Sequence, residues 1–311
     1  VNTLYDSMQS IAITLVLVLG LIILVISVLY SGQVVMPMKE VAGSIAMISS
    51  GDFNETMQIT GYSEAEDISD KFNSMLSVLQ NLEDARQEFV SNVSHELKTP
   101  MTSMKVLADS LVGQEGVPEE LYQEFMVDIN EELERMNKII NDLLTLVKMD
   151  KNASEVNISE VNINEFLEAI LKQLQPIADK RNIEMIFESV RSVTAQVDEV
   201  KLAMAFRNLI ENAIKYNYDN GWVRVSLNAD HKFFYLKVSD SGVGIPEELQ
   251  DSIFERFYRV DKARSRETGG NGLGLAITRN AILLHRGSIK VHSIEQQGTT
   301  FAVRIPLMYS E

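Results

Sequence analysis

A stretch of twenty residues near the start of the chain, IAITLVLVLGLIILVISVLY at positions 11–30, contains no charged side chain. A helix rises about 1.5 Å per residue, so such a stretch covers roughly the 30 Å hydrocarbon core of a bilayer. A signal peptide is disfavoured because no basic segment precedes the stretch and no small-residue cleavage site follows it. A buried core helix is disfavoured because leucine, isoleucine and valine occupy every face. We therefore predict a transmembrane helix at 11–30, with 1–10 as the end of an extracytoplasmic region.

Composition removes several classes of function. The 311-residue chain has a formal net charge of −16, which argues against nucleic-acid binding because little excess cation is present to displace counterions from phosphates. The chain has no cysteine, which excludes disulfides, thiolate metal sites and cysteine nucleophiles. The first residue is Val1 rather than methionine, so we expect a fragment or a processed chain.

Two helical patterns separated by a polar connector follow the apolar stretch. The first is expected to begin near Pro37, because proline is favoured in the first helical turn, and to end near Gly51. A connector at 52–63 precedes apolar residues with the 4, 3, 4, 3 spacing of a coiled coil. The arrangement resembles a HAMP linker, which passes signals from membrane to cytoplasm, and we assign 31–84 to it. The seam residues are Ile68, Phe72, Met75, Leu79 and Leu82.

The coiled-coil register slips by one residue around His95. Continuing the seam places Glu96, rather than Leu97, at the next core position, and a slipped seam is a place where packing can adopt two arrangements. The turn GQEGVPEE then leads to a second amphipathic helix at about 119–149. Two copies of such a helical hairpin make a four-helix bundle, so we expect a homodimer formed by a dimerisation domain at 85–150.

Three neighbours of His95, in the segment SNVSHELKTP, favour a reactive histidine in a helical turn that can move. Glu96 can accept a proton from the imidazole or orient it, which makes the ring a better nucleophile near neutral pH. Thr99 lies one helical turn further on, where its hydroxyl could hold a water. Pro100 removes a backbone hydrogen bond and bends the helix, so the turn around His95 can move. On residue type alone, an exposed structural histidine is the alternative.

Beyond residue 150 the pattern changes to short strands alternating with helices. The order predicts an α/β sandwich at 151–311, with helices covering one face of a sheet, after NASEVNISEVN as a polar linker or edge strand. We expect helices near 163–180, 198–217 and 272–286, and strands at IEMIFES, VRVSL, FFYLKVSD, SIKVHS and TFAVRIP.

A helix with two asparagines on one face is the first of four motifs in this region. In NLIENAIKYN, Asn208, Asn212 and Lys215 are spaced four and three residues apart, beside Glu211. Amide oxygens are hard ligands that suit Mg²⁺, and a lysine suits a phosphate. Asparagine is a poor helix former, so two of them need another reason than a solvated helix face.

The other three motifs contain glycine. DSGVGI begins with Asp240, an acceptor able to read an amino group, and its glycines let the backbone approach a ligand. GGNGLGLAI precedes a helix whose first N–H groups suit phosphates. GTTF at 298–301 is expected to form a hairpin turn. The glycine spacing matches neither a Rossmann fingerprint nor a P-loop.

A basic segment, IFERFYRVDKARSRETGGN, connects the second and third motifs. It is the densest basic patch of an acidic chain and is typical of a mobile lid over phosphates, although a solvated loop explains each charge separately. Its cations are Arg256, Arg259, Lys262, Arg264 and Arg266.

The order of the motifs is more specific than any one of them. HELKTP resembles the phosphoacceptor motif of bacterial sensor histidine kinases. The four later motifs resemble, in order, the ATP-binding fold of the GHKL or Bergerat type that these kinases share with gyrase, the heat-shock chaperone and mismatch-repair ATPases. Together they resemble histidine kinases alone, strongly over 90–311 and loosely over 31–82.

This resemblance implies roles for individual residues. His95 would attack the γ-phosphate of ATP, with Glu96 as its general base, and Thr99 would position a water for a reverse, phosphatase reaction. Asn212 is implied as the Mg²⁺ ligand, and Asp240 as the reader of adenine. The implied ATP-binding residues are Asn208, Asn212, Lys215, Tyr216, Asp240, Gly242, Gly244, Arg259, Gly270, Gly272, Gly274 and Thr299.

The resemblance further implies an ATP- and Mg²⁺-dependent protein-histidine kinase in a bacterial cell membrane, with 31–311 in the cytoplasm. It would first phosphorylate its own histidine, in cis or in trans within the homodimer. It would then pass the phosphoryl group to an aspartate on the receiver domain of a response regulator. Two other classes are weighed against it. A chaperone-like ATPase would hydrolyse ATP without His95, and a scaffold that only dimerises would not bind ATP.

Overall fold

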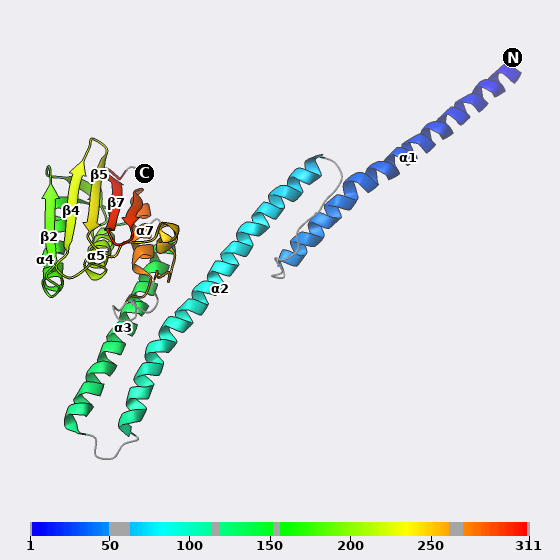
Figure 1. Cartoon of the computed structure of the whole chain (residues 1–311). Helices are drawn as coiled ribbons and strands as arrows, with labels where there is room; N and C mark the ends of the chain where they lie inside the picture. The colour runs from blue at the N-terminus through cyan, green and yellow to red at the C-terminus, as the bar shows by residue number, and fades with distance from the viewer. Residues whose placement is uncertain (1, 50–62, 113–117, 152–155, 261–269, 310–311) are drawn as a thin grey trace. The chain divides into compact units, whose positions relative to one another are not determined.

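The computed structural model describes residues 2–49, 63–112, 118–151, 156–260 and 270–309. It divides into two compact units, Val1–Ser91 and Asn92–Glu311. Figure 1 shows their helices and strands and labels those for which there is room. Four predicted features lie wholly or largely outside the described residues: the polar connector, the GQEGVPEE turn, the first part of NASEVNISEVN, and the part of the basic segment that holds Lys262, Arg264 and Arg266.

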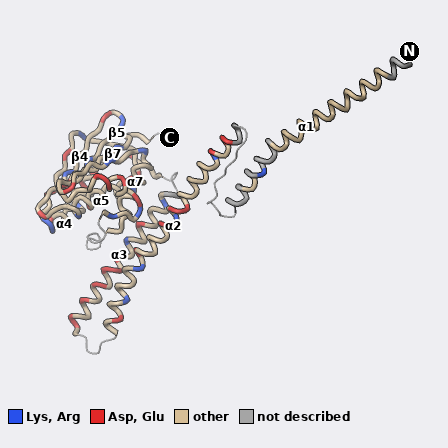
Figure 2. Tube along the Cα trace, turned by 45° about the vertical axis from the view of Figure 1, so that its right-hand side comes forward, with Lys and Arg blue, Asp and Glu red and all other residues tan. Residues whose placement is uncertain are grey.

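One long helix, α1, runs from Asn2 to Ser49. Its segment Ser7–Gly32 has a mean hydropathy of 3.2, lies fully exposed, and is long and apolar enough to cross a membrane. Figure 2 shows no acidic or basic residue along this segment. The predicted helix start near Pro37 is wrong, because α1 continues through that residue from the apolar segment before it. An interior proline costs a helix one backbone hydrogen bond, which a helix of this length tolerates.

The second helix, α2, runs from Ser63 to Val112 and passes through Pro100 without ending there. The predicted coiled-coil seam is not the buried face of the single chain. Met75 and Leu82 on that seam are exposed, whereas Leu76 beside it is buried. This is expected of a seam that only a partner helix can cover.

Helix α3, from Glu119 to Lys151, is the predicted second helix of the hairpin. Acidic and basic residues are interspersed along it, as Figure 2 shows. Its last turns also have an apolar face, since Leu146 and Met149 belong to the same buried cluster as the sandwich that follows. The end of the hairpin is therefore part of the core of the second unit.

The rest of the second unit is the predicted α/β sandwich, with a five-stranded sheet of order β2-β4-β5-β7-β6 and a two-stranded sheet of β1 and β3. Strands β2 and β4 are parallel, and the other neighbours are antiparallel. The strands are β1 Ser159–Asn162, β2 Glu184–Ser189, β3 Thr194–Val197, β4 Trp222–Ala229, β5 Phe233–Asp240, β6 Ser288–Ile294 and β7 Gly298–Pro306. The helices are α4 Ile163–Asp179, α5 Glu199–Lys215 and α7 Gly274–Leu284, with short 3-10 helices η1 Glu247–Leu249 and η2 Ser252–Phe254.

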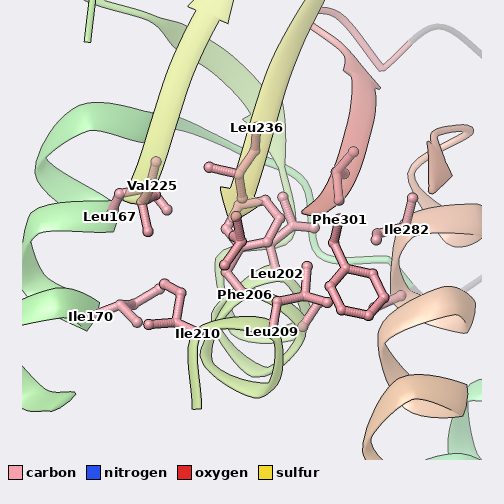
Figure 3. Close-up of a cluster of buried hydrophobic side chains, with 14 of the residues drawn as sticks. Leu167, Ile170, Leu202, Phe206, Leu209, Ile210, Val225, Leu236, Ile282 and Phe301 are labelled. Atoms are coloured by element: carbon pink, nitrogen blue, oxygen red, sulfur yellow. The ribbon is translucent and has the colours of Figure 1, made fainter. Parts of the chain in front are cut away.

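Helices α4, α5 and α7 cover one face of the five-stranded sheet (Figure 1). The strands have the pattern that such a one-sided cover requires, since buried side chains alternate with more exposed ones along β4 and β5. Figure 3 shows Phe206 and Leu209 of α5 gathered with Leu236 of β5 and Phe301 of β7. All four of these side chains are buried. The predicted sandwich is confirmed, but strand β3 was not predicted because four residues carry too little pattern.

The GTTF motif is not the predicted hairpin turn. The turn lies at 295–297, where Gln296 has a positive φ of 63°, and Gly298 already begins β7. Gly298 has a φ of 111°, and a Cβ atom there would lie 1.9 Å from the Asp240 carbonyl oxygen. The motif therefore brings the start of β7 into backbone contact with the end of β5.

A buried histidine joins α7 to the start of α5. The His285 Nε2 accepts the Asp198 backbone N–H at 2.8 Å, and its Nδ1 lies 2.7 Å from the Ala281 carbonyl oxygen. Because Nε2 accepts, the proton sits on Nδ1 and the ring is neutral. Burial lowers the pKa of His285 from its ordinary value of 6.5, against the raising effect of the Ala281 carbonyl.

This histidine makes the stability of the sandwich depend on pH. Since the folded pKa is lowered, the unfolded chain binds the proton more readily, so the stabilisation is complete above pH 6.5 and is lost as the pH falls below it. We expect His285→Gln to cost about 1–3 kcal/mol at pH 7.5 and to lose less than the unmodified chain on acidification. Urea unfolding followed by the fluorescence of Trp222, the single tryptophan, measures both. His292→Gln, at an exposed histidine on β6, is the control; equal pH slopes for the unmodified and His285→Gln chains would contradict the assignment.

Candidate functional site

A pocket of about 360 Å³ lies where helix α5, the last residue of β5, the start of β7 and the start of α7 meet. It brings together all but one of the predicted binding residues, although they come from stretches that are far apart in the sequence. The predicted residues that line it are Asn208, Asn212, Lys215, Tyr216, Asp240, Gly244, Arg259, Gly270, Gly272, Gly274 and Thr299.

Helix α5 supplies the wall that the asparagine spacing predicted. Asn212 and Lys215 line the pocket, and the Lys215 Nζ lies 5.3 Å from the centroid of the Tyr216 ring. Burial lowers the pKa of Lys215 from 10.5 to about 8, and the nearby Lys138 lowers it further while Glu211 raises it. Lys215 is therefore a cation in the neutral range that is poorly solvated before a ligand arrives, which strengthens its attraction for phosphate.

The Asp240 carboxylate at the end of β5 is oriented by two backbone donors. The Gly242 N–H donates to its Oδ1 at 2.9 Å and the Thr299 N–H donates to the same oxygen at 3.2 Å. No hydrogen bond from the described part of the chain reaches Oδ2, which leaves that oxygen of a pocket-lining residue available as an acceptor. Burial raises the pKa of Asp240 to about 6, although the two backbone hydrogen bonds lower it.

Gly242 is the one predicted binding residue that does not line the pocket. A Cβ atom at this position would lie 2.3 Å from the Tyr216 carbonyl oxygen, so only glycine fits. Its role is to orient Asp240 through its N–H, and the adjacent Val243 N–H donates to the Tyr216 carbonyl at 3.1 Å. The turn after β5 is thus fixed against the residues that follow α5.

The start of α7 adds N–H groups to the pocket. No side chain caps the first turn, and the glycines before it leave its backbone open to a ligand. Asn208 Nδ2 donates to the Gly274 carbonyl at 3.2 Å, so this asparagine also ties α5 to α7. Asn271 accepts the Leu273 N–H at 3.1 Å and holds the loop in place.

Among the pocket residues that were not predicted from the sequence are Lys138 and Asp142 of α3, and Asn271. Asn271 Nδ2 donates to the Asp142 Oδ2 at 2.6 Å, and the Lys138 Nζ lies 3.5 Å from the Glu211 Oε1. Burial raises the pKa of Asp142, with Asn271 and Lys138 acting to lower it. The only sequence signal for Lys138 and Asp142 was the amphipathic pattern of α3, which gives no information on which sandwich loop the helix meets.

His95 lies outside this pocket. It is exposed on α2, in a shallow groove with Lys98, Thr99 and residues of the next turn. The Thr99 hydroxyl donates to the His95 carbonyl at 3.2 Å. Glu96 is half-buried, and its Oε1 lies 3.7 Å from Nη1 of Arg259, which lines the pocket. One ion pair therefore connects the histidine segment to the pocket rim.

The side chains that line the pocket could ligate a cation that is also bound by a ligand's oxygens, but they do not form a complete metal site by themselves. Within the described ranges, no group of three or more histidine, cysteine, aspartate or glutamate side chains is placed to hold a metal. Asn212, whose side chain carries one amide oxygen, lines the pocket. Mg²⁺ commonly keeps several waters and binds through one or two protein oxygens together with substrate phosphates, which this set fits.

Two known protein families match parts of the chain from residue 85 onward. Residues 85–152 match the His Kinase A (phospho-acceptor) domain, and residues 197–308 match the histidine kinase-, DNA gyrase B-, and HSP90-like ATPase domain. A phospho-acceptor hairpin followed by such an ATPase domain defines a class of phosphotransfer proteins. The chain belongs to the two-component sensor histidine kinases.

Individual relatives agree with this assignment. The sensor protein kinase WalK of Staphylococcus aureus is 37% identical over 276 residues, which are 86% of this chain and 64% of the relative. WalK of Staphylococcus epidermidis is 36% identical over 281 residues, covering 89% of this chain and 44% of the relative. The chain thus spans between 44% and 64% of the length of these relatives. The solved histidine kinase ThkA in complex with the response regulator protein TrrA has the same fold, with a TM-score of 0.57 at 24% identity over 73% of this chain and 64% of that one.

Proposed function

We propose that this chain binds ATP in the pocket and transfers its γ-phosphoryl group to His95, from which the group passes to an aspartate of a response regulator. The observation that carries the proposal is the contact between Arg259, on the pocket wall, and Glu96, next to His95. It connects a phosphate-suited site to an exposed imidazole within one unit of the protein.

Each end of the pocket suits one end of the nucleotide. Asp240 Oδ2 accepts the exocyclic amine of adenine, and Thr299 lies beside it. Lys215, Arg259 and the first N–H groups of α7 bind the phosphates. Asn208 orients the start of α7, and Asn212 supplies an oxygen to Mg²⁺, the ion that neutralises phosphate charge when it is bound.

The transfer step makes one bond and breaks one. A ring nitrogen of His95 forms a bond to the γ-phosphorus while the bond from that phosphorus to the β–γ bridging oxygen breaks, which leaves ADP. Glu96 accepts the imidazole proton or holds the ring in the reactive orientation. Thr99 is proposed to position water for the dephosphorylation of the partner, after its hydroxyl leaves the His95 carbonyl.

The remaining domains serve this chemistry. We propose a cell-membrane protein with 1–10 outside, 11–30 across the membrane and 31–311 in the cytoplasm, where ATP is available. Segment 31–84 is a HAMP linker, 85–150 a homodimer-forming bundle and 151–311 the catalytic domain. The exposed seam residues Met75 and Leu82 support dimerisation, because a second copy would cover them.

Labelled nucleotides test the proposal against an ATPase that transfers nothing to protein. The full chain in lipid nanodiscs is incubated with Mg²⁺ and ATP labelled at the γ- or α-phosphate. We expect label to be retained on the protein from γ-labelled ATP and none from α-labelled ATP. Release of inorganic phosphate without protein labelling would favour the ATPase alternative instead.

The affinity for ATP is expected to peak between pH 6 and pH 8. Above about pH 8, Lys215 loses its charge, and below about pH 6, Asp240 is protonated. The plot of ATP affinity against pH should therefore fall on both sides, with an alkaline limb due to Lys215 and an acidic limb due to Asp240. The loss of one charged contact weakens binding about tenfold. Binding titrations across this range measure the profile, with Lys215→Gln as the matched variant.

That variant should bind more weakly at pH 7 and should lack the alkaline limb while it keeps the acidic one. The nucleotide's own protonation affects both proteins equally, so it does not account for a difference between them. An alkaline limb of the same size in Lys215→Gln would contradict the role of Lys215.

A further inference from the structure

We infer that Arg181 is a positioning residue of the nucleotide pocket, although it lies outside that pocket and on another element. The inference deepens the proposed function and rests on it. Arg181 stands in the turn between α4 and β2, where its own N–H donates to the Ala178 carbonyl and its carbonyl accepts the Asn220 N–H at 3.1 Å. The backbone of Arg181 is therefore held at both its N–H and its carbonyl.

The guanidinium group of Arg181 is directed at the end of α5. Its Nη1 donates to the carbonyls of Ile214 and Lys215, each at 2.8 Å, and its Nη2 donates to the Asn217 carbonyl at 2.8 Å. The Nε completes the set with a bond of 2.9 Å to the Asp219 carboxylate. A planar fork with fixed donor directions suits several acceptors at once, which a lysine ammonium does not.

These bonds satisfy groups that a helix end leaves open. The last four carbonyls of an α-helix have no partner within the helix, and those of Ile214 and Lys215 are two of these in α5. The Ile214 carbonyl also accepts the Asn217 N–H, at 3.4 Å, so Arg181 adds a second donor there. A cation at this position also complements the negative end of the helix dipole. Arg181 therefore fixes the conformation in which α5 ends.

The segment so fixed is the one that carries the pocket wall. Lys215 and Tyr216 line the pocket, and the Tyr216 carbonyl accepts the Val243 N–H in the turn that orients Asp240. Asn217 is fully buried, and its side chain bonds to the Trp222 carbonyl and the Ser241 hydroxyl at the ends of β4 and β5. Movement of residues 214–217 would thus displace both the phosphate-binding lysine and the adenine-reading carboxylate.

The contacts separate a positioning role from a general contribution to stability. The salt bridge to Asp219 points outward, with that carboxylate side chain 70% exposed, whereas the three carbonyl bonds hold the pocket segment. Removing Asp219 should leave the carbonyl bonds in place, so Asp219→Ala is the matched control. Arg181→Lys keeps a cation at the helix end but cannot reach all three carbonyls, and it serves if Arg181→Ala does not fold.

The test measures ATP affinity of the full chain in nanodiscs as a function of pH, with folding checked by Trp222 fluorescence. We expect Arg181→Ala and Arg181→Lys to bind ATP about tenfold more weakly, the size of effect given by the loss of hydrogen bonds to a charged group. Their alkaline limb should move up from about pH 8 toward the ordinary value of 10.5 for lysine, because a displaced Lys215 is better solvated. The charged groups around Lys215 that also act on it are Lys138, Glu211, Arg259 and Arg135, and none of them is changed.

A purely structural role would lower the unfolding midpoint and leave both the affinity and the alkaline limb of the folded protein unchanged. That result for folded Arg181→Ala or Arg181→Lys overturns the inference, as does an equal loss of affinity in Asp219→Ala. An unmodified chain that binds no ATP contradicts the proposed function itself, and the inference with it.

Discussion

Replacing Asp240 with asparagine is expected to weaken ATP binding about a hundredfold, because it changes the chemistry of Oδ2, the carboxylate oxygen that accepts neither of the two backbone N–H groups. The Gly242 and Thr299 N–H groups both donate to Oδ1, so the amide oxygen of the new side chain would take that place. The amide NH₂ would then replace Oδ2 and present donors to the donating amine of adenine. The opposite amide orientation would bring the NH₂ against both backbone donors. Titration with a fluorescent ATP analogue measures the loss.

The same substitution should also change which nucleotide base the pocket prefers. Inosine triphosphate carries a carbonyl where ATP carries the amine, and a carbonyl accepts from an amide NH₂. Asp240→Asn should therefore lose less affinity for inosine triphosphate than for ATP. An equal loss for both nucleotides would sink the idea that Oδ2 reads the amine.

A matched control is available on another loop. Asp230 also accepts two backbone N–H groups through its Oδ1, from Lys232 and Phe233, and the Tyr235 hydroxyl bonds to its Oδ2. These hydrogen bonds, with the Lys232 N–H first, lower the pKa of Asp230 to about 2. Asp230→Asn changes the same kind of carboxylate outside the pocket, so it should leave ATP affinity unchanged.

Replacing His95 with glutamine is expected to abolish phosphorylation of the chain and to leave ATP binding intact. The imidazole is the proposed nucleophile, and glutamine has no nitrogen basic enough to replace it. His95 does not line the pocket, so the affinity for ATP should change by less than about twofold, as for a surface substitution. Labelling with γ-labelled ATP and a nucleotide titration on the same preparation separate the two quantities.

His292→Gln is the control for loss of an exposed histidine, and it should be phosphorylated like the unmodified chain. Phosphorylation that survives in His95→Gln would place the nucleophile elsewhere. Loss of ATP binding in His95→Gln would mean that the histidine acts on the pocket rather than receiving the phosphoryl group.

The residues that sequence reasoning placed correctly are those whose position follows from local geometry. Asn212 and Lys215 are three residues apart on a helix, so a shared face is fixed by helical spacing alone. Asp240 is the last residue of a strand with clear alternation, so it had to lie where the chain leaves the sheet. In each case the helix or strand is predicted first, and its regular geometry then gives the direction of the side chain.

The features that were missed depend on contacts between distant segments. Nothing in the pattern around Lys138 or Asp142 indicates that α3 meets the pocket, and Asn271 occupies a position between glycines that looked unspecific. Arg181 shows the same limit, since its three carbonyl partners lie more than thirty residues ahead. GTTF was misplaced by a few residues because the turn forms at Gln296, a non-glycine residue with positive φ that sequence rules disfavour.

The central claim, that His95 receives the γ-phosphoryl group of ATP, is tested most directly by the chemistry and position of the label. The full chain in nanodiscs is phosphorylated with γ-labelled ATP and Mg²⁺, then treated with acid or base, and the labelled peptide is sequenced by mass spectrometry at neutral pH. We predict a label that acid removes, base preserves and the peptide map places on His95. An acid-stable label, or one on any other residue, would contradict the account.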